Sequence, residues 1–308
     1  MSTQYISIII PVYNRANLVK SRSLKSALRQ TDQGSEIVVV DDGSSDDLES
    51  SLRDLIDKKK VIYLRQKHKG VSAARNLGVK HAKGKVVVFL DSDDELKPNY
   101  ISSIKECFAK RGAEVVIPGF ILQDERGRVS KATLQKPRWM LGMGGGIALK
   151  KSVFTQKGIW YDERLRNFED SDFGFRVGAE AKIVFLNKFI YVYHFKSLIY
   201  KESETHLSSD PQYQLEHFKN FKEKHLDFYR KSGPEALSFL YFWEGTLYAQ
   251  SDLKCARKSF IEALRVKPSL RVLVYLLMAS FGSIAIYRQL NRIFIYIVRK
   301  YKILRSSL

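Results

Sequence analysis

The chain has 308 residues, a formal net charge of +19 and 44% apolar residues, so it is long enough for two domains with sizeable cores. This composition excludes a disordered chain, a collagen-like repeat and a small disulfide scaffold. Two cysteines form no disulfide framework, which favours a reducing compartment. The charge is typical of proteins that bind nucleic acid, anionic membranes or phosphate-rich substrates. It is unevenly distributed, because residues 263–308 contain nine Lys and Arg and no Asp or Glu.

Buried strands and helices alternate along the first half of the chain. The β-branched run from Ile6 to Ile10 predicts a core strand and not a signal peptide. This alternation predicts an α/β fold, with a mostly parallel central sheet flanked by helices. Further strands are expected over 36–41, 61–64, 86–90, 114–122, 147–149 and 183–193. Helices are expected through Leu18, Leu24, Ala27 and Leu28, over 50–59, and over 72–82 with Ser72 as N-cap.

Polar clusters follow three of these strands, at Tyr13-Asn14, at residues 41–44 and at residues 91–94. Ligands of such sheets bind at the carboxyl ends of the strands. A single acidic strand end is also explained by helix capping. Two acidic strand ends that converge on one crevice repel each other unless a positive charge lies between them. A divalent metal would supply that charge, and hard oxygen ligands suit Mg²⁺ or Mn²⁺.

A second acidic segment, residues 167–173, opens another predicted helix. Acidic residues in a first turn favour the helix dipole, so capping is one interpretation of Glu169 and Asp170. His194, after the predicted strand 183–193, is either a ligand or an ordinary packed histidine.

Six segments in this order resemble the inverting family 2 glycosyltransferases of the GT-A fold, as found in bacterial surface-polysaccharide synthesis. The resemblance covers roughly the first 200 residues. The segments are SIIIPVYN (7–14), EIVVVDDGSSDD (36–47), GVSAARNLGVKHAKG (70–84), VVVFLDSDDELKP (86–98), GIWYDERL (158–165) and NFEDSDFGFR (167–176).

The resemblance implies a binding site for a nucleotide-sugar. It places Asp42 at the uracil ring of a UDP-sugar and Asp93, the second carboxylate of the DxD motif, on the metal. His194 matches a histidine that some members use as a metal ligand. The donor-binding residues that the resemblance implies are Pro11, Tyr13, Asp41, Asp42, Arg75, Asp91 and Ser92.

The resemblance also implies that Asp170, in the Glu-Asp motif, is the catalytic base. A sugar hydroxyl is a poor nucleophile at neutral pH, so a carboxylate must take its proton. Capping or support of the metal is the alternative role for Asp170, and Asp172 is the rival base.

From about residue 204 the pattern becomes helical, so we expect a catalytic domain over 1–203 and a helical domain over 204–308. A tetratricopeptide-like pattern around Trp243, Gly245 and Phe260 predicts a helical hairpin. The uncharged run 272–287 is too short to span a membrane.

The last predicted helix has an apolar face and a basic face. That pattern is typical of a helix in an anionic membrane interface, and packing on the domain or a role in oligomerisation are the alternatives. The apolar face comprises Leu290, Ile293, Phe294, Ile297, Tyr301 and Leu304, and the basic face Arg288, Arg292, Arg299 and Lys302.

Together these features predict a metal-dependent inverting transferase acting on a glycan or lipid-linked acceptor, cytoplasmic and peripheral on the inner face of the cell membrane. The alternative is a non-catalytic, nucleotide-binding scaffold of a glycan assembly complex on the same fold. No nucleic-acid partner is expected, because the basic residues are not interleaved with stacking aromatic residues.

Overall fold

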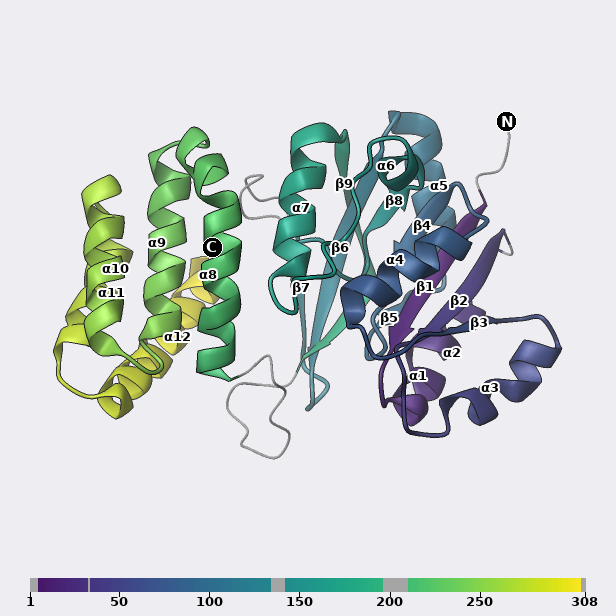
Figure 1. Ribbon diagram of the computed structural model, residues 1–308, viewed down its shortest axis with the longest axis horizontal. Helices are drawn as coiled ribbons and strands as arrows, with labels where there is room; N and C mark the ends of the chain where they lie inside the picture. Colours follow the sequence, from purple (N-terminus) through teal and green to yellow (C-terminus); the bar gives the residue numbers. More distant parts are fainter. Residues whose placement is uncertain (1–4, 33, 134–141, 196–209, 306–308) are drawn as a thin grey trace. The chain divides into compact units, whose positions relative to one another are not determined.

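The computed structural model describes residues 5–32, 34–133, 142–195 and 210–305, without the side chains of residues 195 and 296–305. The chain divides into two compact units, Met1–Lys201 and Glu202–Leu308 (Figure 1). This division, like the expected boundary between residues 203 and 204, lies outside the described residues.

The first unit is built around one mixed sheet of nine strands in the described part of the chain. The strands are β1 (Ile6–Val12), β2 (Ser35–Asp41), β3 (Ile62–Arg65), β4 (Val86–Phe89), β5 (Glu95–Leu96), β6 (Val115–Asp124), β7 (Val129–Ala132), β8 (Ala148–Lys150) and β9 (Ile183–Phe195). Their order is β3-β2-β1-β4-β8-β6-β9-β5, and β7 pairs with β6. The predicted α/β fold is confirmed, and antiparallel pairs are confined to the part of the sheet beyond β4.

Seven helices are described in the first unit. They are α1 (Ala16–Ser21), α2 (Ser23–Leu28), α3 (Leu48–Asp57), α4 (Val71–His81), α5 (Tyr100–Arg111), α6 (Ser152–Thr155) and α7 (Glu169–Glu180). Helix α4 packs on β1 and β2 (Figure 1). Gly78 makes this close packing possible, because a Cβ there would lie 2.4 Å from the side chain of Ile9.

The parallel strands bring distant polar residues to one edge of the sheet. In the β1–β2 register Val12 lies opposite Asp41, and in the β2–β3 register Asp41 lies opposite Arg65. Strand β4 runs parallel to β1 on its other side, so the chain leaves β4 towards Asp91 at the same edge. Strands β1, β2 and β4 are buried because their sequences are mostly continuous apolar runs, whereas β3 is only partly buried.

Two local predictions were wrong. The helix expected through Leu18 and Leu28 is two short helices, α1 and α2, interrupted at Arg22, and Leu28 is exposed. Ser72 is not the N-cap of α4, because the cap position is Gly70, whose φ of 93° favours glycine. Ser72 is buried inside the first turn instead.

The second unit is helical throughout its described part. Its helices are α8 (Pro211–Lys231), α9 (Pro234–Tyr248), α10 (Leu253–Val266), α11 (Leu270–Ser280) and α12 (Ile284–Arg305). The predicted hairpin is confirmed as α9 and α10, and Gly245 lies against the ring of Phe260. Asp252 caps α10 by accepting hydrogen bonds from two backbone N–H groups.

Candidate active site

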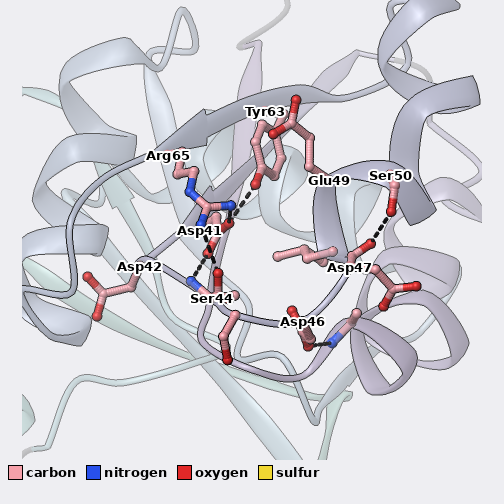
Figure 2. A network of polar contacts seen from close by, with 12 residues as sticks. Asp41, Asp42, Ser44, Asp46, Asp47, Glu49, Ser50, Tyr63 and Arg65 are labelled. Carbon is pink, nitrogen blue, oxygen red and sulfur yellow. Dashed lines mark hydrogen bonds and ion pairs between the residues drawn. The ribbon is translucent and has the colours of Figure 1, made fainter.

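Asp41 fixes the turn that follows β2, and Figure 2 shows its contacts. Its buried carboxylate accepts hydrogen bonds from Ser44 N at 2.7 Å, from Tyr63 Oη at 2.5 Å and from Arg65 Nη1 at 3.1 Å. Burial raises the pKa of Asp41, but the hydrogen bonds from Tyr63 and Ser44 outweigh it, so the pKa lies below its ordinary value. Asp41 therefore shapes the strand end and has little capacity left for a ligand.

Asp42 points away from that network (Figure 2) and holds the segment before α4. Its carboxylate accepts hydrogen bonds from Gln66 Nε2 at 2.7 Å and from the backbone N–H groups of Lys69 and Gly70, both at 2.8 Å. His68 Nδ1 lies 2.9 Å from the same carboxylate. The ring of His68 stacks on Tyr13 with a centroid distance of 4.0 Å.

Tyr13, Asp42 and His68 line a pocket with a volume of about 280 Å³. The volume is close to the lower end of the range for small-molecule sites. Its lining residues are Pro11, Val12, Tyr13, Arg15, Asp42, His68, Gly70, Val71, Ala74 and Ser92. Four of the predicted donor-binding residues, Pro11, Tyr13, Asp42 and Ser92, thus meet in one pocket.

Arg75 lies between the carboxylates of two separate motifs. Its buried guanidinium donates from Nη1 to Asp170 Oδ1 at 2.7 Å and from Nη2 to Asp91 Oδ1 at 3.0 Å. Glu169 Oε1 lies 3.9 Å from Nη1. The structure thus joins α4, the DxD motif and the start of α7 through one cation, which the sequence placed only near a donor.

Asp170 lies in the first turn of α7, as predicted, and makes no capping hydrogen bond there. Its side chain is 38% exposed. Burial raises the pKa of Asp170 and Arg75 opposes the rise, whereas burial and the Asp170 charge raise the pKa of Glu169 to about 7. The rival Asp172 is fully buried and accepts a hydrogen bond from Arg176 Nε at 3.1 Å. Of the two candidate bases, Asp170 is accessible to solvent and Asp172 is not.

The second carboxylate of the DxD motif is held by an arginine that the sequence did not single out. Arg15 Nη1 lies 2.8 Å from Asp93 Oδ2 and 3.3 Å from Ser92 Oγ. The sequence argument assigned the neutralisation of these carboxylates to a metal, but Arg15 and Arg75 supply positive charge from the protein itself. No sequence signal identified Arg15, because its partner is 78 residues away.

His194 contacts the end of the same motif. Its Nε2 lies 2.9 Å from Glu95 Oε1, and its backbone N–H donates to Asp94 Oδ1 at 2.9 Å. The buried Asp94 also accepts from Tyr191 Oη at 2.7 Å. Burial and the nearby Asp91 charge raise the pKa of Asp94 to about 8. The structure places His194 beside Glu95 and gives no contact between it and Asp93.

A glycine segment lies against the carboxylates of Asp170 and Asp91. A Cβ at Gly144 would be 2.6 Å from Asp170 Oδ2, and one at Gly145 would be 2.7 Å from Asp91 Oδ2. The segment is fixed, since Met143 N donates to Asp170 O at 2.9 Å and Tyr100 Oη donates to Gly146 O at 2.9 Å. No local sequence pattern predicts these contacts, because they are all long-range.

The donor atoms available for a metal are hard oxygens. In the described part of the chain, no group of three or more His, Cys, Asp or Glu side chains is arranged to hold one. Mg²⁺ and chemically similar cations commonly take one or two carboxylates from a protein and the remaining ligands from substrate phosphates and water. The partly exposed carboxylates of Asp91 and Asp93 fit that mode.

The glycosyl transferase family 2 model matches residues 7–169, more than half of the chain. The chain therefore belongs to glycosyl transferase family 2, as its six motifs predicted.

The chain is similar to several bacterial proteins named glycosyltransferases. An uncharacterised one from Rickettsia prowazekii (strain Madrid E) is 34% identical over 195 residues, which is 58% of this chain and 60% of the relative. GlyA of Streptococcus pneumoniae serotype 4 is 25% identical over 257 residues, which is 73% of this chain and 37% of GlyA. A relative in Rickettsia conorii is 51% identical over 90 residues, but the match spans only 15% of its length.

Among solved structures, the fold is similar to that of S. aureus TarS residues 1–349, solved in complex with UDP-GlcNAc. The TM-score is 0.65 at 19% sequence identity, and the match covers 92% of this chain and 89% of the TarS chain. At this identity the likeness shows the fold, which is that of a glycosyltransferase with a helical C-terminal region.

Proposed function

We propose that the chain is a metal-dependent inverting glycosyltransferase that moves a sugar from a UDP-sugar to a glycan or lipid-linked acceptor. The observation that carries the proposal is the pairing of Asp170 and Asp91 through Arg75 at the edge of the sheet. Ser92 and Ala74, the sequence neighbours of Asp91 and Arg75, line the adjacent pocket. The TarS structures with UDP-GlcNAc and with UDP support a uridine nucleotide as donor.

The pocket would bind the nucleoside. Pro11, Tyr13 and Asp42 would form the base site, and Asp41 would act through the turn that it holds. The ring of Tyr13 is already covered by His68, so a base must displace His68 or stack on the other side of Tyr13. Asp91 and Ser92 would contact the ribose side of the donor.

Asp170 would be the general base. Its carboxylate takes the proton of the acceptor hydroxyl while that oxygen forms a bond to the anomeric carbon. The bond from this carbon to the diphosphate oxygen breaks on the opposite face, and the electron pair leaves with the nucleoside diphosphate. Attack opposite the leaving group inverts the anomeric centre.

Asp93 would hold the divalent cation, Mn²⁺ or Mg²⁺, together with the diphosphate oxygens, and His194 would join only after leaving Glu95. A cation held there would supply Lewis-acid stabilisation of the departing diphosphate. Arg15 would then leave Asp93 and remain available to the anionic donor, because its side chain lines the pocket.

We propose that the acceptor belongs to cell-surface polysaccharide synthesis. The reaction would take place at the cytoplasmic face of the cell membrane, to which the chain would be attached peripherally. The named relatives are bacterial glycosyltransferases, which supports this setting. In the described part of the chain, no helix combines the length and apolar content needed to cross a membrane.

Calorimetry with UDP tests this function. We expect UDP to bind more tightly with Mn²⁺ than without it, and Asp93→Asn to remove that difference. UDP binding that does not respond to Mn²⁺ contradicts the metal role of Asp93. Metal-dependent UDP binding without turnover of any UDP-sugar would indicate the nucleotide-binding scaffold instead.

A further inference from the structure

One face of α11 is a row of exposed, large apolar side chains. Leu270, Leu273, Leu277 and Phe281 recur at helical spacing and are 78%, 42%, 49% and 66% exposed. Large apolar side chains at single positions are normal on a protein surface, but four along one helix face form a continuous patch. We call these four residues the α11 row.

The opposite face of α11 fixes the helix in the core of the second unit. Val272, Tyr275, Met278 and Ala279 are buried there. The ring of Tyr275 contacts Phe242 at a centroid distance of 5.0 Å. The core of the second unit is thus filled by the opposite face of α11. The α11 row is a separate, outward face of the helix.

The face expected from the sequence to meet a membrane is partly used for packing. Leu290 and Phe294 on α12 pack against the same core, and Phe294 meets Tyr275 at a centroid distance of 5.7 Å. Ile293 is exposed, and the expected side chains at Ile297, Tyr301 and Leu304 lie outside the described ones.

The segment that carries the row is basic. Residues 263–308 contain no Asp or Glu, and Arg271, Arg288 and Arg292 are exposed, although Arg271 lies over the ring of Phe242 and Arg288 donates to Gln250 O. Glu262, on the neighbouring helix α10, is paired with Arg265. A symmetric dimer through this face would bring the cations of two copies together. An anionic lipid surface complements both the apolar row and the surrounding arginines.

We propose that the α11 row is a membrane-contact surface that inserts into the interface of an anionic bilayer while the arginines contact lipid headgroups. The surface would hold the enzyme where a lipid-linked acceptor is found, and in that respect the inference rests on the proposed function. Binding would be peripheral, since α11 has 11 residues and is followed by a turn at Gly282, whose φ is 100°.

Flotation with vesicles tests the surface in the full chain. The vesicles contain about one third phosphatidylglycerol in phosphatidylcholine, or phosphatidylcholine alone. The test variant is Leu277→Glu/Phe281→Glu. Its matched control is Leu28→Glu/Val129→Glu, at positions 41% and 66% exposed in the first unit, so both variants change the net charge equally.

We expect the unsubstituted chain to bind anionic vesicles and not neutral ones. The test variant should lose at least about tenfold in vesicle affinity, and the control should lose little. Equal losses in the two variants, or none in the test variant, overturn the proposal. So does a test variant that turns a dimer into a monomer in light scattering while its vesicle binding is unchanged.

UDP binding separates this proposal from the proposed function. Both variants should bind UDP as the unsubstituted chain does, which also shows that they are folded. A chain that turns over donor but ignores anionic vesicles overturns only the membrane surface. A chain that binds vesicles through the row but never binds UDP overturns only the transferase.

Discussion

Arg75 Nη1 donates to Asp170 Oδ1 at 2.7 Å, so the proposed base is oriented by a buried cation before any substrate arrives. The same guanidinium lies 5.1 Å from the ring centroid of Tyr161. These contacts restrict Arg75 and, through it, the position of the carboxylate. A base that must be placed accurately is therefore supported by a rigid neighbour.

Gly144→Ala should lower turnover without unfolding the chain. Its Cβ would lie 2.6 Å from Asp170 Oδ2, so the carboxylate must shift from the position in which Arg75 holds it. We expect kcat to fall at least about tenfold, with UDP affinity unchanged. Gly142→Ala is the control, since its Cβ would come no closer than 4.0 Å to another residue. Similar kinetics for the two variants would argue against close contact with the base.

The rate should fall on the acid side at an unusually high pH. The base must be ionised, and burial raises the pKa of Asp170 against the opposing charge of Arg75, so protonation should abolish activity above the ordinary aspartate pKa of about 3.9. Glu169→Gln should leave the acid limb of kcat/KM nearly where it is, because the pKa of Glu169 is raised to about 7 and its side chain is already largely neutral on the acid side. An acid limb near pH 4 in the unsubstituted chain would contradict this prediction.

Arg75→Met should destabilise the chain strongly. It leaves Asp91, Glu169 and Asp170 without their shared cation, and breaking a buried ion pair typically costs about 3–5 kcal/mol. Urea denaturation should show a smaller loss at pH 5 than at pH 7, because protonation relieves the carboxylate repulsion. Arg53→Met, which breaks an exposed pair with Glu49, should cost no more than about 1 kcal/mol. Equal losses from the two substitutions would indicate that the Arg75 cluster contributes no more than a surface ion pair.

Gly245→Ala should weaken the helical hairpin of α9 and α10. The added Cβ would lie 2.5 Å from the ring of Phe260, which is fully buried and cannot move away. Such overpacking typically costs about 1–3 kcal/mol in the free energy of unfolding. Denaturation followed by helical circular dichroism measures the loss. Gly233 has open space but a φ of 98°, so it cannot serve as a control. Unchanged stability would contradict tight packing between Gly245 and Phe260.

Strands β1, β2 and β4 could be predicted because they are buried on both faces, whereas the short strands β5 and β7 have no such apolar run and were not predicted. Ile8 and Val39 lie in continuous apolar runs, and in a parallel sheet the carboxylates that follow such runs must meet at one edge. The motif resemblance then selected Asp170 and Asp93, and the structure places them at that edge, each with an arginine.

What the sequence could not provide was the set of partners. Arg15 and Asp93, like Gly144 and Asp170, are far apart in the chain and meet only through the sheet topology. Ser72 was misassigned because a serine at a predicted helix start satisfies the capping pattern, whereas Gly70 adopts the positive φ at the actual start. Local sequence patterns specify helices and strands. Contacts between distant side chains depend on how these helices and strands pack.

The most direct test of the account is donor turnover by Asp170→Asn, compared with Asp172→Asn at a temperature where both variants are folded. If Asp170 is the base, Asp170→Asn should lower kcat by about 10²–10⁴-fold while UDP still binds, because the proposed role of Asp170 is to take a proton and not to hold the nucleotide. Asp172→Asn should keep most of its turnover, since Asp172 is buried against Arg176. Full turnover by Asp170→Asn, or a loss confined to Asp172→Asn, would contradict the central assignment.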